Sequence, residues 1–174
     1  MKKIAYLLLL SGILFSCKHD KKEMLVKTWH GVKLENPQMD SFFTESQMYL
    51  DTVGKGHDDA TNMALYGVTN MDSLRHVMQQ QLDSAKEMQM SAVKNTIFNF
   101  RKDSVVILTF SGNVDSSKWY FDTDGSLVLD ELSPKQPGGD KVKMEVLTLS
   151  DTVLKLKFAE NGSSSTVTFH PGTN

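Results

Sequence analysis

The chain has 174 residues, and its 19 lysines and arginines against 21 aspartates and glutamates leave a formal net charge of −2 at pH 7. This balance creates no basic field that would attract nucleic acid or anionic lipid, so we expect no nucleic-acid partner. The chain holds a single cysteine, which excludes an intramolecular disulfide, and a folded domain must therefore be stabilised by packing alone.

The start of the sequence has the pattern of an export signal. Two lysines, Lys2 and Lys3, precede an apolar run over residues 4–15. The run is too short for a helix that spans a bilayer, which needs about 20 apolar residues, and it has the basic flank of a secretory signal. We therefore predict that residues 1–16 are a signal peptide.

The signal ends in four residues that lead to the cysteine. Residues 14–17 read Leu-Phe-Ser-Cys, which resembles the lipobox of bacterial lipoproteins, with a bulkier residue than usual at Phe15. The resemblance implies that Cys17 carries diacylglycerol on its sulfur and becomes the N-terminus of the mature chain. The alternative is an ordinary signal peptide followed by a coincidental cysteine. Acyl chains bind lipid with about 0.8 kcal/mol per buried CH₂, so a lipidated Cys17 would make the membrane itself a partner.

Residues 17–24 are predicted to be the lipidated cysteine and its tether. The segment after the cysteine is charged and has no apolar periodicity, which indicates a solvated linker. Because Lys18 rather than an aspartate follows the cysteine, the segment lacks the inner-membrane retention signal of lipoprotein sorting. We therefore expect the mature chain in the cell envelope, anchored by its lipid in the outer membrane.

Residues 25–174 are numerous enough for one domain with its own hydrophobic core. Residues 25–35 alternate loosely between apolar and polar side chains and are rich in β-branched and aromatic residues, which predicts a first strand. The strand stops at Asn36 and Pro37. An N-cap residue followed by proline at the first helical position predicts that a helix begins there.

Two helices are predicted to form an insertion over about residues 36–93. In the first, apolar residues recur at three- and four-residue steps until a turn with two glycines ends the helix. The second runs over about 72–92, after an N-cap at Thr69 or Asn70, with polar residues covering the rest of its surface. Its apolar stripe consists of Met71, Leu74, Met78, Leu82, Ala85, Met88 and Ala92.

The rest of the domain predicts seven strands joined mostly by short turns. Alternation is clearest at residues 153–158, where apolar side chains share one face and two lysines share the other. The turns at 122–125 and 160–163 supply the Asp, Asn and Gly residues that adopt positive φ in hairpins, and only the connection at 133–140 is longer. The strands are placed near residues 94–101, 104–110, 117–121, 126–131, 141–149, 152–158 and 164–170.

With the first strand, the domain has eight strands in sequential antiparallel order. An eight-stranded meander closes most economically into an up-and-down barrel, because closure removes the exposed strand edges. The predicted fold is therefore mainly β: an eight-stranded antiparallel up-and-down barrel with a two-helix insertion between strands 1 and 2.

Three segments of these strands match the pattern of a known family. They are residues 27–31 (Lys-Thr-Trp-His-Gly), residues 119–127 across a central Asp-Gly hairpin, and residues 147–156 in a leucine-rich hairpin. In these features the chain resembles the small lipocalin-like lipoproteins of Gram-negative envelopes, over roughly 25–35 and 94–170. The resemblance implies a lipocalin-like barrel with an internal ligand site. The helical insertion is a departure, since a typical lipocalin has a loop there.

The barrel interior is the candidate ligand site. A barrel of eight strands either holds one small ligand or is filled by its own side chains, and the sequence leaves both alternatives open. Val106 and Val167 lie in the inward-facing apolar rows. The candidate ligand contacts in those rows are Phe98, Phe100, Leu108, Phe110, Leu154, Leu156, Phe158 and Phe169.

The apolar stripe of the second helix has three interpretations. It packs on the barrel, covers an open mouth as a lid, or binds a protein partner through an exposed heptad-like face. Methionine is flexible and polarisable, which suits an adaptable apolar surface. The candidate lid consists of Met71, Leu74, Met78, Leu82 and Met88.

Motifs for catalysis are missing from the sequence. There is no serine nucleophile elbow, zinc-protease helix or phosphate-binding glycine loop, so we expect no enzymatic activity and no cofactor. The best metal-ligand cluster is residues 57–59, His-Asp-Asp, and the turn at 122–125 lacks the later ligands of a calcium loop, so we expect no metal. The predicted function is to bind a small hydrophobic ligand or lipid in the envelope. The alternative is a structural or adaptor lipoprotein that binds a protein partner through its helical insertion.

Overall fold

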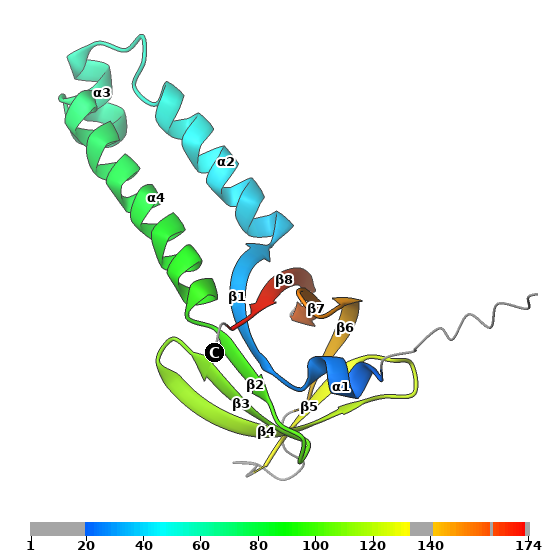
Figure 1. Ribbon diagram of the computed structural model, residues 1–174. Coiled ribbons are helices and arrows are strands. Elements are labelled where there is room, and N and C mark those ends of the chain that lie inside the picture. The colour runs from blue at the N-terminus through cyan, green and yellow to red at the C-terminus, as the bar shows by residue number, and fades with distance from the viewer. Residues whose placement is uncertain (1–19, 133–140, 161, 173–174) are drawn as a thin grey trace, which may run out of the picture.

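The computed structural model describes residues 20–132, 141–160 and 162–172. Its strands form a closed barrel in sequential order, and every neighbouring pair, including β1 with β8, is antiparallel (Figure 1). This confirms the predicted fold class, a mainly β, eight-stranded antiparallel barrel with helices between its first two strands. The strands are β1 (Thr28–Glu35), β2 (Ile97–Phe100), β3 (Val105–Phe110), β4 (Asn113–Phe121), β5 (Leu127–Glu131), β6 (Lys141–Leu149), β7 (Leu154–Glu160) and β8 (Ser163–Pro171).

Some of the predicted features fall on residues outside this description. They are the signal peptide at 1–16, the lipid site Cys17 and the long connection at 133–140. Over the described residues, no helix combines the length and the apolar character needed to cross a bilayer. The lipid anchor therefore stays a prediction from the sequence.

Three strands, β1, β2 and β4, begin three or more residues away from their predicted starts. β2 begins at Ile97 rather than near residue 94 because the preceding helix, α4 (Met71–Lys94), continues to Lys94. β1 begins three residues later, at Thr28, because Lys21–Leu25 form a short helix, α1, where a solvated tether is expected. β4 begins four residues earlier, at Asn113, because a tight turn at Ser111 and Gly112, both with positive φ, joins it directly to β3. At β1 and β4, local hydrogen bonding extends regular structure beyond the apolar pattern.

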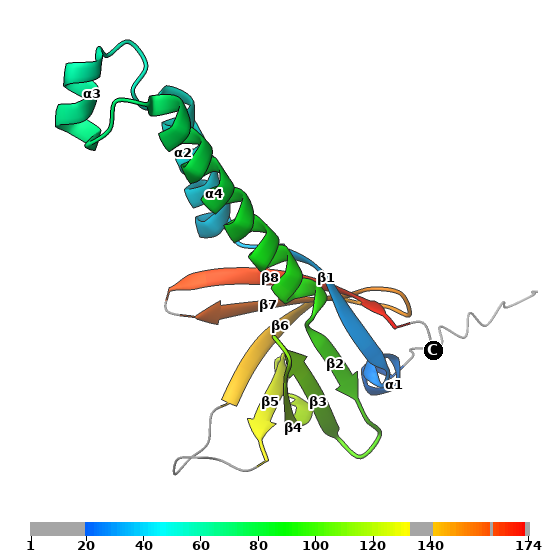
Figure 2. The same ribbon diagram turned by 90° about the vertical axis from the view of Figure 1, so that its left-hand side faces the viewer.

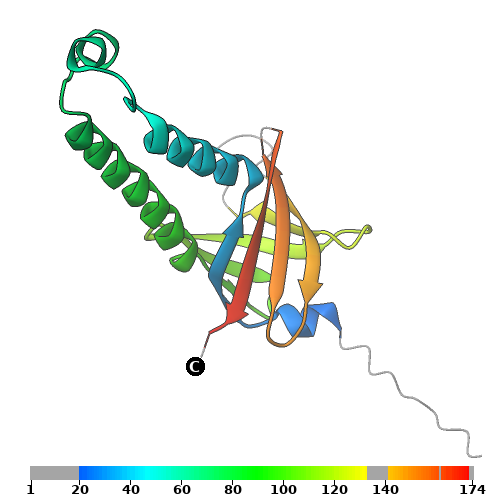
Figure 3. The ribbon, with the colours of Figure 1, turned by 90° about the horizontal axis from the view of Figure 1, so that it is seen from above.

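Helix α1 lies at the end of the barrel opposite the helical insertion (Figures 1 and 3). Its N-cap is Asp20, whose side chain accepts a hydrogen bond of 3.0 Å from the amide of Lys22. Leu25, the last residue of α1, is fully buried, and the indole Nε1 of Trp29 donates to its carbonyl oxygen over 2.9 Å. The helix is therefore tied to the first strand and closes this end of the barrel.

The packed core occupies the half of the barrel next to α1. Trp29 and Phe100 are among the largest fully buried side chains, and Trp119 packs edge-on against Phe100 with ring centroids 5.5 Å apart. Leu127 and Leu154 are also fully buried and belong to the same cluster. Because the strands alternate in direction, these residues lie at the beginnings or ends of their strands that are nearest to α1.

The insertion between β1 and β2 contains three helices, one more than predicted. Asn36 caps the first of them, as predicted, and the last is capped by Asn70, whose side chain accepts a 3.0 Å hydrogen bond from the amide of Ser73. The middle helix is capped by Asp58, whose side chain accepts a 2.8 Å hydrogen bond from the amide of Thr61. The helices are α2 (Pro37–Thr52), α3 (Asp59–Tyr66) and α4 (Met71–Lys94).

Helices α2 and α4 run side by side as a long arm that projects from the barrel, with α3 at its tip (Figures 1 and 2). Polar contacts hold the two helices together. Gln47 Nε2 donates to Gln79 Oε1 over 3.0 Å, and Arg75 Nη1 donates over 2.7 Å to the carbonyl oxygen of Val53, the C-cap of α2. These contacts hold together the half of the arm that is farther from the barrel.

At the base of the arm, the last turn of α4 lies directly against β1. The amide of Gly31 donates a 2.9 Å hydrogen bond to the carbonyl oxygen of Thr96. A Cβ atom at position 31 would overlap the carbonyl oxygen of Val93. The missing side chain of Gly31 therefore allows the end of α4 to reach the barrel opening.

Candidate functional site

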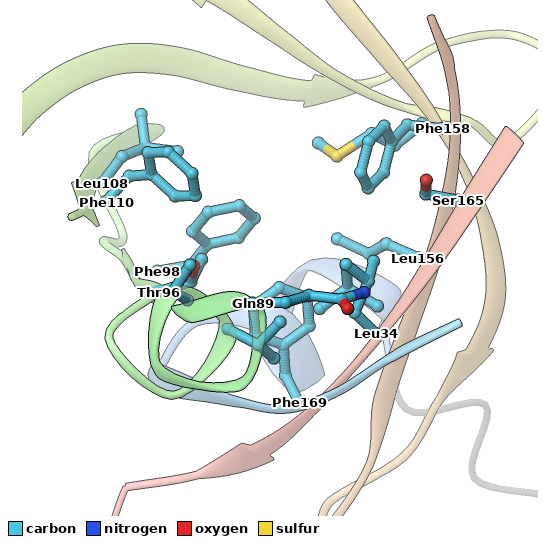
Figure 4. A pocket seen from close by; sticks show the side chains of 14 residues that line it. Leu34, Gln89, Thr96, Phe98, Leu108, Phe110, Leu156, Phe158, Ser165 and Phe169 are labelled. Atoms are coloured by element: carbon cyan, nitrogen blue, oxygen red, sulfur yellow. The ribbon is translucent and has the colours of Figure 1, made fainter. Parts of the chain in front are cut away.

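A cavity of about 400 Å³ opens at the end of the barrel where α4 returns to the sheet (Figure 4). Fourteen residues line it, and eleven of these have entirely apolar side chains. The other three, Gln89, Thr96 and Ser165, are polar but uncharged. The apolar lining consists of Leu34, Ala92, Val93, Phe98, Leu108, Phe110, Met144, Leu156, Phe158, Val167 and Phe169.

The alternation of side chains along the strands forms this apolar wall. Leu156 of β7 is the register partner of Val167 of β8, and both line the cavity, whereas Lys155 next to them faces outward to Glu35. The ring of Phe98 stacks on that of Phe169 with centroids 4.9 Å apart. The inner surface is thus made of closely packed hydrocarbon, with the charges on the outside of the barrel.

Six of the eight predicted ligand contacts line the cavity, and Figure 4 shows them pointing inward from different strands. The other two, Phe100 and Leu154, lie in the packed core, as does Val106. The two predicted alternatives, an interior filled by side chains and an interior that can hold a ligand, therefore each apply to one half of the barrel. The half next to α1 is filled, and the other half is hollow. The six are Phe98, Leu108, Phe110, Leu156, Phe158 and Phe169.

None of the five predicted lid residues is among the residues that line the cavity. Met78 and Leu82 line a separate groove between α4 and α2, Met71 is buried, and Met88 is 68% exposed. Leu74 is half-buried on the same helix. Met78 and Leu82 therefore face α2, so the middle of the stripe pairs the two helices of the arm, which projects away from the barrel.

The part of the insertion that reaches the cavity is the last two turns of α4, which the prediction did not single out. Gln89, Ala92 and Val93 line the cavity there. Ala92 belongs to the predicted apolar stripe, but Gln89 and Val93 do not. Leu34 of β1 and Met144 of β6 also line the wall, and their inward direction follows from the strand register.

Two of the three polar side chains of the lining, those of Ser165 and Thr96, are engaged in structural hydrogen bonds. Asn36 Nδ2 donates to Ser165 Oγ over 2.9 Å, while the Oδ1 atom of the same side chain caps α2. The hydroxyl of Thr96 donates to the carbonyl oxygen of Ala92 over 2.8 Å. None of the fourteen lining residues is titratable, so the cavity wall offers apolar contact without an acid, a base or a charged group.

The predicted acidic clusters serve as caps and turns. Asp58 caps α3, and the hydrogen bonds from Thr61 lower the pKa of its carboxyl. In the turn between β4 and β5, Asp122 and Asp124 each lie 2.8 Å from the Nζ atom of Lys143. The hydrogen bond from Lys143, followed by those from Ser126, lowers the pKa of Asp124 to about 2. Within the described ranges, no group of three or more His, Cys, Asp or Glu residues is arranged to hold a metal ion.

Comparison with known proteins gives one structural likeness. The solved structure of a DUF4847 family protein from Bacteroides vulgatus is similar to this chain with 10% sequence identity and a TM-score of 0.46, covering 88% of this chain and 98% of that one. No family model matches the chain, and no curated protein matches it.

Proposed function

We propose that this chain is a lipid-anchored envelope lipoprotein whose lipocalin-like barrel binds a small hydrophobic molecule or lipid and carries out no chemistry on it. The observation that supports this is the apolar cavity of about 400 Å³ in one half of the barrel. It exceeds the roughly 300 Å³ at which small-molecule sites begin. A wall without titratable groups suits binding rather than catalysis.

The energetics of the cavity favour an apolar occupant. Each CH₂ group that moves from water into the hydrocarbon wall contributes about 0.8 kcal/mol, so a chain of about ten methylenes supplies about 8 kcal/mol, which corresponds to binding at micromolar concentrations. A polar molecule would lose its hydrogen bonds to water and find few partners, because Thr96 and Ser165 are already engaged. The cavity therefore selects for hydrocarbon.

A paired substitution on α4 tests this function. We expect the purified chain to bind the neutral apolar dye N-phenylnaphthylamine saturably, with a fluorescence increase that dodecanol reverses by competition. Ala92→Trp, which places an indole in the cavity, should abolish dye binding. The matched control is Ala85→Trp, on the same helix but in the groove against α2, and it should bind as the unchanged chain does. Absence of saturable binding, or equal binding by both variants, would count against the proposal.

The lipid anchor is tested separately at Cys17. Cells that express the full chain in the presence of labelled palmitate should yield a labelled protein in the outer-membrane fraction. Cys17→Ser should remove the label and release the chain from the membrane, because the thiol is the only attachment point for diacylglycerol. An unlabelled native chain would show that residues 1–16 act as an ordinary signal peptide.

The helical arm supports a second candidate function, that of an adaptor that binds a protein partner. Nine of the sixteen exposed large hydrophobic side chains in the described residues lie on the insertion. A partner that binds the arm should be lost on Phe42→Ser with Met48→Ser, and retained on Val114→Ser with Val142→Ser on the barrel surface. The nine are Met39, Phe42, Met48, Tyr49, Met63, Leu65, Val77, Met88 and Met90.

A further inference from the structure

A second concavity, of about 410 Å³, adjoins the apolar cavity at the base of the arm. The two share Leu34, Gln89 and Val93 in their linings, so they meet where α4 passes over the end of β1. Gln89 is the polar member of this shared set, and Figure 4 shows its amide at the cavity. We call the second concavity the basal groove.

The basal groove differs from the cavity in that it is charged. Lys33 of β1, together with Lys86 and Lys94 of α4, lines it, against one carboxylate, that of Asp40. Three ammonium groups therefore surround a site whose neighbour has no charge at all, although the whole chain carries a net charge of −2.

The partners of these lysines leave the groove with an excess of positive charge. Lys33 Nζ lies 2.8 Å from Glu35, a carboxylate that also pairs with Lys155 at 2.9 Å on the outer face of the barrel. The Nζ atom of Lys86 lies 5.8 Å from the centroid of the Phe43 ring, a contact that holds the ammonium in place without neutralising it. Lys94 is exposed in the last turn of α4.

We propose that the ligand is a single-chain amphiphile with a carboxylate head, whose tail fills the apolar cavity and whose head lies among Lys33, Lys86 and Lys94. This inference rests on the proposed ligand-binding function. The hydrocarbon tail of the ligand would pass from the groove into the cavity beside Leu34, Gln89 and Val93, which line both. A carboxylate that is held by lysines at the water side keeps its hydration in part, while the tail loses contact with water.

Three probes that share a twelve-carbon tail but differ in the charge of the head group test this inference. Dodecanoate, dodecanol and dodecylammonium are compared below their micelle concentrations by displacement of N-phenylnaphthylamine. At moderate ionic strength we expect dodecanoate to bind about tenfold more tightly than dodecanol, since three partly exposed ion pairs supply a total of this order. Dodecylammonium should bind more weakly than dodecanol, and added salt should reduce the difference between the two charged probes.

A triple variant locates the head. In Lys33→Gln, Lys86→Gln, Lys94→Gln, the preference for dodecanoate over dodecanol should fall to less than about twofold, while dodecanol binds unchanged. The matched control removes three lysines elsewhere: Lys55→Gln, Lys102→Gln, Lys118→Gln. If the control loses the preference equally, the groove is not the head site.

The outcomes separate this inference from the function on which it rests. If dodecanol and dodecanoate displace the dye from the unchanged chain with equal affinity, the proposed preference for a carboxylate head is wrong, while the proposal that the cavity binds an apolar ligand is retained. If none of the three probes displaces the dye, or the dye itself does not bind, the proposed ligand-binding function fails as well.

Discussion

At the scale of single residues, Gly31 has a specific steric role. It lies in β1 beside the irregularity in pairing with β8, and its amide bonds to Thr96 just after α4 ends. The atom that a side chain would overlap, the carbonyl oxygen of Val93, belongs to backbone and cannot rotate away. The position of α4 over the cavity therefore depends on the absence of one Cβ atom.

Gly31→Ala should destabilise the chain by about 1–3 kcal/mol, because the methyl group forces the base of α4 away from β1. Urea unfolding of the purified chain measures this loss. The control is Val32→Ala at the next position, which is exposed and should change the unfolding free energy by less than about 0.5 kcal/mol. Equal effects of the two substitutions would show that the close approach of α4 carries no energetic weight.

The turn carboxylates give a pH prediction. Lys143 lowers the pKa of Asp122 and holds that of Asp124 at about 2. A carboxyl with a lowered folded pKa stabilises the fold above its unfolded pKa of about 4, and this stabilisation is lost as the pH falls toward about 2. Lys143→Gln should raise the NMR titration midpoint of Asp124 and flatten the loss of stability over this range. An unchanged midpoint would exclude Lys143 as the cause, and Lys118→Gln is the control.

At the scale of elements, α1 acts as the closure of one barrel end. It is five residues long, too short to be stable by itself, since isolated helices shorter than about 12 residues are marginal in water. Its stability must come from burial of Leu25 and from the hydrogen bond of Trp29. Through Leu25, the stability of α1 therefore depends on the barrel core.

Leu25→Ala should therefore destabilise the whole barrel, by about 2–5 kcal/mol, and not only release α1. Thermal or urea unfolding followed by tryptophan fluorescence measures this loss, because Trp29 lies against the substituted residue. Met24→Ala, at the half-buried neighbouring position, is the control and should cost clearly less. A loss below about 1 kcal/mol at Leu25 would mean that α1 merely rests on the barrel.

The sequence is most informative about elements with strong local signals. The predicted caps, at Asn36 and at Thr69 or Asn70, and the alternation in β7 and β8 indicate helix starts and strand faces that the structure confirms, with Asn70 as the second cap. Helices α1 and α3 are not predicted, since each is short and depends on a capping aspartate, Asp20 or Asp58, without apolar periodicity. Such helices form only where tertiary contacts or caps offset the cost of nucleation.

At the scale of the whole molecule, the cavity arises because the packed core fills only one half of the barrel. Strand periodicity predicts which side chains face inward, and six of the eight candidates do line the cavity. Strand periodicity does not predict whether an inward-facing side chain lies in the packed core or in the cavity. Phe98 and Phe100 share one face of β2 and differ only in their distance from α1. Nor does helical periodicity give the direction of the arm, so the base of α4 is not distinguished from the part of its stripe that faces α2.

Substitutions along α4 should distinguish the arm from the site. Met78→Ala and Met88→Ala, in two residues that do not line the cavity, should keep the dissociation constant for N-phenylnaphthylamine within about twofold. Phe98→Ala should weaken binding by tenfold or more, because it removes about 1.5–3 kcal/mol of apolar contact. Weaker dye binding by Met88→Ala would support the predicted role of Met88 as a lid residue.

The placement of α1 has a consequence for where a cargo could come from. This helix begins four residues after Cys17, a stretch of at most about 14 Å. A chain tethered through that cysteine would hold its sealed end near the bilayer, with the opening and the arm turned toward the aqueous compartment. Such an orientation would favour delivery of a ligand from water or from another protein over lateral uptake from the leaflet that would hold a lipid on Cys17.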